Sequence, residues 1–156
     1  MKPTKDLIKQ RIIQMIYEYR KRNYYISTDK RKLQPTVIHR FLTNSYWAKG
    51  CTYSNIKRRI KNSFCFGVYH NKKQVGFCRV ISDTVTFSYL ADVFIIEEYR
   101  GKGLSKWLMK CVMSHPEIGK VDSWMLKTKD AHELYEKFGF KRAEEPKKIM
   151  EKQYNK

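Results

Sequence analysis

The sequence predicts one mixed α/β domain whose helices pack on both faces of a mainly antiparallel sheet. Two observations lead to this prediction. Helical and strand-like patterns alternate along the chain, and three strand-like segments follow one another in its middle, separated only by short turns. The length of 156 residues suits one domain with a core of its own, and no repeat, linker or low-complexity segment divides it.

The N-terminal segment predicts a helix followed by a short strand. Apolar residues recur at helical spacing over residues 6–22, which indicates an amphipathic helix whose apolar face packs on the domain or on a second subunit. Residues 24–29 indicate the strand. We therefore separate an N-terminal helical extension, residues 1–23, from the main domain, residues 24–156.

Two helices and three strands are expected next. One helix begins at Pro35, because proline is favoured in a first helical turn, and a short basic helix covers residues 52–62. Residues 63–70 and 74–83 then form a hairpin. Residues 84–96 are a long third strand that follows after a short turn.

The last third predicts a helix, a strand and a second helix. A glycine-containing junction leads from the third strand into a helix that runs to about His115. Residues 121–128 indicate a buried strand. Residues 130–138 indicate a helix with Asp130 as its N-cap and Gly139 just beyond its end. The segment after that helix is strand-like and is broken by a proline.

The chain is strongly basic. It has 33 Lys and Arg residues against 15 Asp and Glu residues, a formal net charge of +18. This excess indicates either an anionic partner or a cationic surface without a specific partner. We interpret "RKR" at residues 20–22 and "KRRIK" at residues 57–61 as local patches. A basic nucleic-acid-binding module is therefore one alternative, although no RRM, KH or helix-turn-helix pattern accompanies the clusters.

Composition argues against several other classes of protein. No apolar run is long enough to span a membrane, and the N-terminus lacks the apolar stretch of a signal peptide, so we expect a soluble cytoplasmic protein. The cysteines lack zinc-ligand spacing, which argues against a metal site and favours buried free thiols. These cysteines are Cys51, Cys65, Cys78 and Cys111.

The junction "EEYRGKGLSKWL", residues 97–108, places two glycines and three cations between a strand and a helix. A helix N-terminus offers unpaired N–H groups and the positive end of the helix dipole, and glycines let that backbone approach a phosphate closely. Neither the P-loop nor the G-x-G-x-x-G dinucleotide pattern is present. The junction is either an ordinary turn or a phosphate cradle.

Two segments carry a resemblance to a known family. "RGKGLS", residues 100–105, resembles motif A of the GCN5-related N-acetyltransferases (GNAT), whose pattern is [RQ]-x-x-G-x-[GA] after a strand. "AHELYEKFGF", residues 131–140, resembles the family's A-x-x-L-Y-x-x-x-G-F signature. The resemblance covers residues 24–152. It implies a small bacterial-type GNAT fold with six to seven strands, acetyl-CoA as cofactor, and direct attack of a small-molecule amine on the thioester.

The resemblance also implies which residues hold the cofactor. Backbone groups at the end of the third strand would pair with the pantetheine arm, and the junction would hold the pyrophosphate. Ser105 stands where the family usually has Gly or Ala, and Thr128 where many members have an Asn that contacts the cofactor. The expected cofactor-binding residues are Phe94, Ile95, Ile96, Arg100, Gly101, Lys102, Gly103, Leu104, Ser105 and Thr128.

Two residues are expected to act in the chemistry. Tyr135 matches the family tyrosine that protonates the departing thiolate; otherwise it is a core aromatic. Asp92 lies where relatives often carry an acidic group near the acceptor, so it either accepts the proton of the amine or is a structural carboxylate.

Three further residues are expected to contact the acceptor. Tyr46 and Trp47 end the first helix of the main domain and either shape the acceptor pocket or belong to the core. Arg79 interrupts a strand and either binds an acidic group of the acceptor or pairs with Asp83 or Asp92. A non-catalytic CoA-binding protein of the same fold is a further alternative, and a homodimer is compatible with the family.

Overall fold

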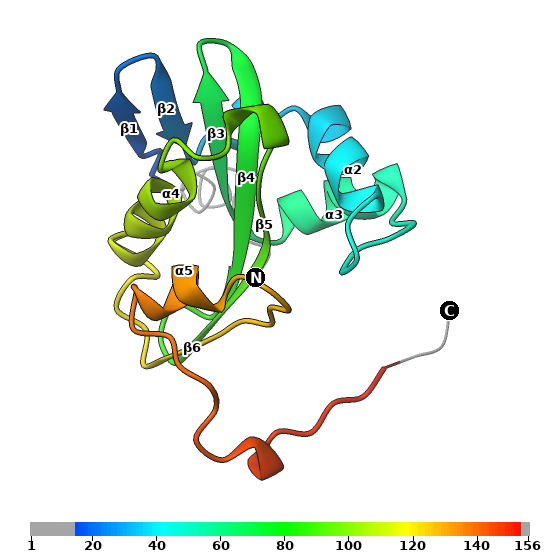
Figure 1. Cartoon of the computed structure of the whole chain (residues 1–156), viewed down its shortest axis with the longest axis vertical. Coiled ribbons are helices and arrows are strands. Elements are labelled where there is room, and N and C mark those ends of the chain that lie inside the picture. The colour runs from blue at the N-terminus through cyan, green and yellow to red at the C-terminus, as the bar shows by residue number, and fades with distance from the viewer. Residues whose placement is uncertain (1–14, 154–156) are drawn as a thin grey trace, which may run out of the picture.

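A computed structural model describes residues 15–153 of the chain. Its centre is a six-stranded sheet in which the strands lie in chain order, β1-β2-β3-β4-β5-β6 (Figure 1). Neighbouring strands are antiparallel except for β5 and β6, which are parallel. The strands are β1 (Glu18–Lys21), β2 (Tyr24–Ser27), β3 (Phe64–His70), β4 (Lys73–Ser82), β5 (Phe87–Ile95) and β6 (Ser123–Met125).

Helices cover both faces of this sheet. Helix α4 (Leu104–Met113) lies on one face, with α5 (His132–Glu136) beside it, and α2 (Pro35–Thr43) and α3 (Tyr53–Lys61) lie on the other (Figure 1). Two separate apolar clusters fill the two interfaces, one containing Leu108 of α4 and the other Ile38 of α2. The predicted fold class is therefore confirmed. Short 3₁₀ turns, η1 (Lys30–Lys32), η2 (Glu97–Tyr99) and η3 (Pro146–Lys148), complete the described chain.

The helix expected over residues 6–22 is wrong where the structure describes it, and its first part, residues 6–14, lies outside the described residues. Glu18–Lys21 forms β1, which pairs with β2 at the edge of the sheet. Met15 and Ile16, two members of the apolar pattern, are exposed. Pairing with β2 has overridden the helical spacing, because β1 gains backbone hydrogen bonds to β2 along its whole length.

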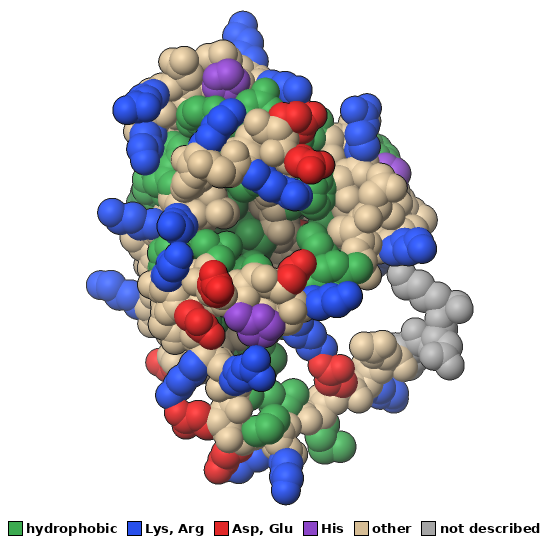
Figure 2. Space-filling model, viewed as in Figure 1, with side chains coloured by type: hydrophobic (Ala, Val, Ile, Leu, Met, Phe, Trp, Pro, Cys, Tyr) green, Lys and Arg blue, Asp and Glu red, His purple; other side chains and the backbone are tan. Residues whose placement is uncertain are grey.

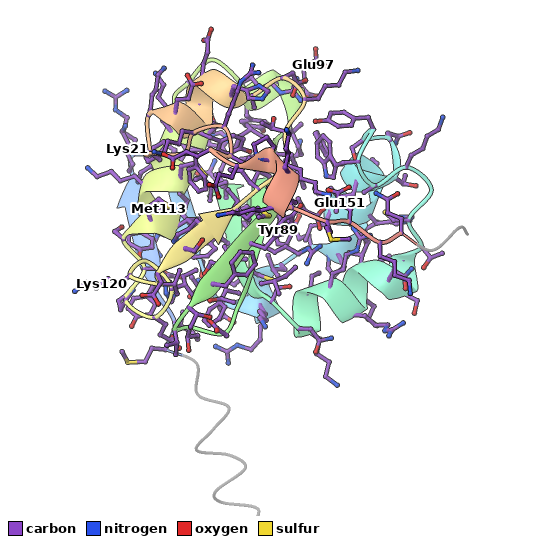
Figure 3. All side chains as sticks on the ribbon, turned by 90° about the horizontal axis from the view of Figure 1, so that it is seen from below. Lys21, Tyr89, Glu97, Met113, Lys120 and Glu151 are labelled. Carbon is purple, nitrogen blue, oxygen red and sulfur yellow. The ribbon has the colours of Figure 1, made fainter. Side chains whose placement is uncertain are left out.

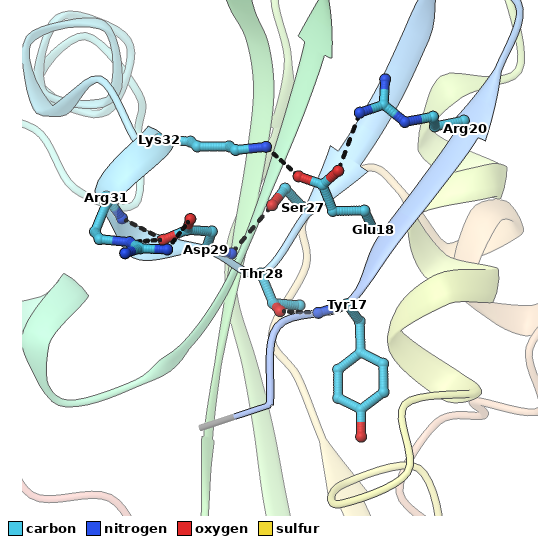
Figure 4. Close-up of polar contacts among 8 residues, drawn as sticks. All are labelled: Tyr17, Glu18, Arg20, Ser27, Thr28, Asp29, Arg31 and Lys32. Carbon is cyan, nitrogen blue, oxygen red and sulfur yellow. Dashed lines mark hydrogen bonds and ion pairs between the residues drawn. The ribbon is translucent and has the colours of Figure 1, made fainter. Parts of the chain in front are cut away.

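Polar contacts hold β1 in place (Figure 4). The backbone N–H of Tyr17 donates to Thr28 Oγ1 over 2.9 Å. The Glu18 carboxylate pairs with Arg20 on its own strand and with Lys32 of η1. Lys32 and Arg20 lower the pKa of this carboxyl group. Arg20, the first residue of the "RKR" cluster, therefore has a partner within the fold.

The strand expected at the end of the chain is also wrong. After β6, the described residues contain α5 and the short turn η3 but no strand. Met150 and Ile149 are exposed, so this segment buries too little apolar surface to fix an extended register. The end of α5 does follow expectation, because Gly139 adopts a φ of +84° and closes the helix through hydrogen bonds from Gly139 N to Glu136 O and from Phe140 N to Tyr135 O.

Strand β5 contains a bulge that matters for the site. Phe77 pairs with Phe94, and Arg79 pairs with Ala91, so one residue of β4 lies opposite two residues of β5, Asp92 and Val93. Asp92 has a left-handed φ of 54°, which short polar side chains tolerate better than most. The extra residue shifts the alternation of side chains between the two faces of the sheet.

No helix among residues 15–153 is long and apolar enough to cross a lipid bilayer.

Candidate active site

Strands β5 and β6 separate after a short contact, which leaves an open edge. Their pairing is confined to Phe87–Tyr89 of β5, so the later residues of β5 lack a strand partner on this side within the described chain. On the opposite side, Ile96 N donates to Val75 O of β4 over 2.8 Å. The alternation of an antiparallel ladder then directs the backbone groups of Ile95 to the open edge. There Arg100 Nε donates to Ile95 O over 3.0 Å, which leaves the Ile95 N–H available.

The junction after β5 presents backbone donors to the same edge. Gly101 and Gly103 have φ values of +73° and +74°, in the left-handed region that glycine adopts without strain. Gly103 is the N-cap of α4 and supplies no side-chain cap, so the first N–H groups of the helix remain unpaired within it. Such N–H groups, together with the positive end of the helix dipole, could hold an anion.

The side chain of Lys102, an expected cofactor-binding residue, lies against the preceding turn η2. Its Nζ donates to Glu98 O over 3.3 Å and lies 5.1 Å from the ring centre of Tyr99. Ile96 does not contribute a free N–H, because its N–H is bonded to Val75.

A cavity of about 420 Å³ lies at this junction, and we name it the junction cavity. It brings together the ends of β5, the glycine-containing turn and the starts of α4 and α5. The expected cofactor residues in its wall are Phe94, Ile95, Arg100, Gly101, Gly103, Leu104 and Ser105. Phe41 of α2 also lines it and stacks on Phe94 with ring centres 3.9 Å apart. Sequence reasoning missed Phe41, which carries no signal beyond an apolar position in a helix.

A second cavity of about 310 Å³ lies on the α3 side of β5, and we name it the arginine cavity. Asp92, which is 7% exposed, lies in its wall between two guanidinium groups. Arg79 Nε donates to Asp92 Oδ2 over 2.5 Å, and Arg59 Nη1 donates to the same oxygen over 3.5 Å. Of the alternatives for Arg79, the structure therefore contains the pair with Asp92.

Asp83, the other candidate partner of Arg79, has a local role. Its Oδ1 accepts hydrogen bonds from the backbone N–H groups of Val85, Thr86 and Phe87 in the β4–β5 turn. These bonds, together with one from the Thr86 hydroxyl, lower the pKa of its carboxyl group far below the usual range.

Arg59 is the functional candidate that sequence reasoning missed. It belongs to the "KRRIK" cluster, which suggested a nucleic-acid footprint, yet its side chain turns inward to Asp92. A signal was present, because Arg59 lies one helical turn after Ile56, which is 1% exposed, and so shares the face of α3 that packs on the sheet.

Tyr135 lies where the two cavities meet. It is 8% exposed, and burial raises the pKa of its phenol well above the usual range, so the hydroxyl stays protonated at neutral pH. The residues common to both walls are Trp47, Val93, Asp130, Ala131 and Tyr135.

Tyr46 and Trp47 join the two sides of the arginine cavity. The Tyr46 hydroxyl accepts a hydrogen bond from the backbone N–H of Lys129 over 3.0 Å, which connects the α2–α3 loop to the loop before α5. Trp47 packs edge-on against Tyr46 with ring centres 4.9 Å apart. Both side chains are about half exposed, so they are not core residues.

Thr128 lies in the wall of the arginine cavity and not in that of the junction cavity. Its Oγ1 accepts a hydrogen bond from Ala131 N over 3.0 Å, at the start of α5. Asp130 is not the N-cap of α5 that the sequence predicted, because the N-cap is Ala131, which has no side-chain cap. Asp130 instead borders both cavities. Tyr89 of β5 also lines the arginine cavity. Figure 3 labels Tyr89, and it also labels Glu151 of the C-terminal segment.

The surface charge is spread widely. Figure 2 shows Lys and Arg side chains across the whole visible face, with Asp and Glu side chains between them.

Comparison with known proteins agrees with this geometry. The family model described as "Acetyltransferase (GNAT) domain" matches residues 61–142, just over half of the chain. The chain belongs to the GNAT acetyltransferase family. It is accordingly an acyltransferase, and its resemblance in the junction and in the α5 segment reflects that membership.

Three GNAT-like proteins illustrate the range of similarity. A Gibberella zeae protein to which acetyltransferase activity is ascribed is 30% identical over 139 residues, which cover 74% of this chain and 77% of that protein. A crystal structure of a GNAT-family protein from Xanthomonas campestris is 42% identical, with a TM-score of 0.82 over 84% of this chain and 93% of that one. An acetyltransferase from Clostridium acetobutylicum, determined with acetyl-CoA, is 13% identical and shares the fold, with a TM-score of 0.59 over 84% of this chain and 95% of that one.

Proposed function

We propose that this GNAT protein transfers an acetyl group from acetyl-CoA to the primary amine of a small molecule. The observation that carries the proposal is the meeting of two cavities at Tyr135. One cavity suits a nucleotide cofactor and the other suits an acceptor. An acetyl group that moves from the first cavity to the second therefore passes beside Tyr135.

The residues of the junction cavity fit acetyl-CoA. The unpaired N–H groups at the start of α4, after two left-handed glycines, suit its pyrophosphate. The Ile95 N–H at the open edge of β5 suits the pantetheine arm, which is recognised by adding to a sheet edge. When bound, acetyl-CoA supplies a thioester carbonyl that an amine can attack and a thiolate that leaves.

Tyr135 is the proposed acid of the reaction. A phenol that stays protonated at neutral pH can donate its proton to a developing thiolate. Trp47 and Ala131 border both cavities beside that hydroxyl.

Asp92 is the proposed acceptor of the amine proton. A primary alkyl ammonium has a pKa near about 10, so the attacking amine must lose a proton first. Two arginines donate to Oδ2 of Asp92, and Oδ1, which has no hydrogen bond from the described residues, would receive that proton directly or through a water molecule.

We also propose that the protein works in the cytoplasm. All four cysteines are free and buried in the fold, which is compatible with a reducing compartment.

Calorimetric titration with acetyl-CoA tests the proposal, with desulfo-CoA and adenosine diphosphate as comparisons. We expect micromolar or tighter binding of acetyl-CoA and weaker binding of the diphosphate, because the diphosphate lacks the arm that pairs with β5. Absence of acetyl-CoA binding at low salt would contradict the proposal.

A further inference from the structure

In the arginine cavity, positive charge exceeds negative charge where Arg59, Arg79 and Asp92 meet. The guanidinium groups of Arg59 and Arg79 share a single carboxylate, Asp92. The Asp92 side chain is 4% exposed, whereas the side chains of Arg79 and Arg59 are 13% and 29% exposed. One positive charge is therefore left uncompensated, and it is the part of the cluster that solvent or a ligand can reach.

The same two arginines border a second hollow. This hollow, of about 360 Å³, lies beside α3 and the start of β3, and no acidic side chain lines it in the described part of the chain. Its polar lining consists of Asn55, Arg58, Arg59, Asn62, Ser63 and Arg79. Arg59 and Arg79 thus form a wall between an entirely neutral or cationic hollow and the arginine cavity.

Donors remain unused on both arginines. Arg79 uses Nε for Asp92 and Nη1 for Ser63 Oγ, the second over 3.3 Å. Among residues 15–153, Arg59 has a hydrogen-bond partner only at Nη1. A guanidinium group has five N–H donors in a planar fork that matches the two oxygens of a carboxylate or a phosphate. The Nη2 group of each arginine is available for such a contact.

We propose that the acceptor amine carries an anionic group, a carboxylate or a phosphate, which Arg59 and Arg79 bind. This inference rests on the proposed acetyl transfer and names the class of its substrate. The anionic group lies at the side of the arginine cavity that adjoins the hollow, and the amine points to the side that adjoins the junction cavity, at Tyr135. Asp92 holds the two guanidinium groups in place.

The overall charge of the protein agrees with an anionic acceptor. A net charge of +18 attracts anions to the surface and repels polycations such as polyamines. The remaining wall of the arginine cavity includes Trp47, Tyr89 and Leu126, which suits an apolar body between the amine and the anionic group.

Binding of small anions tests the inference without knowledge of the natural acceptor. Inorganic phosphate and acetate are titrated in separate experiments into the protein saturated with CoA, so that the cradle at α4 is filled. The comparison is between the native protein, Arg59→Gln and Lys57→Gln. Lys57 lies on the same helix and lines neither cavity, so Lys57→Gln gives the same change of charge away from the site.

We expect at least one anion to bind the native protein and Lys57→Gln with equal affinity, and Arg59→Gln about tenfold more weakly. The preferred anion identifies the chemical group. Equal affinity in all three proteins, or binding of neither anion to the native protein, would overturn the inference. Failure of CoA itself to bind would instead contradict the proposed function, and the titrations without CoA would still compare Arg59→Gln with Lys57→Gln.

Acetylation of matched amines gives an independent measurement. L-phenylalanine is compared with phenethylamine, and O-phosphoethanolamine with ethanolamine, since each pair differs only in the anionic group. We expect kcat/KM at least tenfold higher for the anionic member of one pair, and we expect Arg59→Gln to remove that preference. Equal or faster acetylation of the members that lack the anionic group would overturn the inference and leave acetyl transfer intact.

Discussion

The junction cavity and the arginine cavity meet at Tyr135 but are built in opposite ways. Most of the junction cavity comes from one continuous segment, from Val93 to Ser105, and it presents backbone groups. The arginine cavity takes its side chains from α3, β4, β5, the α2–α3 loop and the segment between β6 and α5. The junction cavity is mostly backbone from one segment, so glycine conformation and helix geometry are enough to form it. The arginine cavity forms only when charged side chains from several elements come together.

This difference predicts different responses to mutation. The junction cavity is sensitive to added bulk and tolerant of changes in neighbouring side chains. The arginine cavity is sensitive to removal of a single charge, because the partners left behind are partly buried.

The largest expected effect is on cofactor binding. Gly103→Glu puts a carboxylate where the pyrophosphate would approach the start of α4, so we expect acetyl-CoA affinity to fall by more than about 100-fold. No atom lies within 4 Å of an added Cβ at this position, so the fold should survive, although the left-handed φ costs roughly 1–2 kcal/mol. Calorimetry and thermal unfolding measure both quantities.

Lys102→Gln is the matched control for Gly103→Glu. It changes the net charge by the same amount at the adjacent residue, but Lys102 is turned to Glu98 and Tyr99. We expect affinity within about threefold of the native protein. If a folded Gly103→Glu protein bound acetyl-CoA as tightly as the native protein, the proposal that the junction holds the pyrophosphate would be wrong.

The second effect is on turnover, at the point where the cavities meet. Tyr135→Phe removes the proton donor and keeps the ring, so we expect kcat to fall about 100-fold with little change in acetyl-CoA affinity. Tyr24→Phe, which alters a ring stacked on His70 outside both cavities, is the control. Unchanged turnover in Tyr135→Phe would leave Tyr135 with a packing role only.

The third effect is on stability, in the arginine cavity. Asp92→Asn leaves two guanidinium groups without their carboxylate, and we expect the free energy of unfolding to fall by about 2 kcal/mol. This is less than a fully buried pair would lose, because Arg59 is partly exposed. Asparagine also tolerates a left-handed φ, so the bulge itself is retained. Urea unfolding measures the change.

Asp122→Asn is the control for this effect, since Asp122 is exposed at the turn before β6 and should change stability by less than about 0.5 kcal/mol. Equal stability of Asp92→Asn and the native protein would mean that the arginines are not held by this carboxylate. A loss of turnover much larger than the loss of stability would support the role of Asp92 as the proton acceptor.

The smallest effect concerns a residue outside both cavities. His115 is 2% exposed among Tyr17, Phe64 and Phe66, and burial lowers its pKa below the ordinary value of 6.5. The unfolded chain therefore binds a proton more readily than the folded one below pH 6.5, and stability should fall as the pH falls through that region.

We expect His115→Gln to weaken this pH dependence by on the order of 1 kcal/mol between pH 7 and pH 5 while acetyl-CoA affinity stays unchanged. Urea unfolding at a series of pH values measures it. The same pH dependence in the variant and the native protein would assign acid sensitivity to other groups.

The sequence by itself determined the fold class and predicted a phosphate cradle at the junction. Gly101, Gly103 and the start of α4 are adjacent in the chain, so local rules of helix capping and glycine conformation predict the cradle. The role expected of Tyr135 came from the resemblance of "AHELYEKFGF" to a family signature with fixed spacing. The same local rules failed for Glu18–Lys21, because pairing with a neighbouring strand outweighed helical spacing.

Only the tertiary structure decided the composition of the arginine cavity. In a regular strand Asp92 would share the face of Leu90, which packs in the α4-side cluster. The bulge moves its carboxylate to the face of Arg79 and α3, where Arg59 reaches it across 33 positions of sequence. No periodicity reveals such a pair, because its members become neighbours only when β5 bulges and α3 packs on the sheet.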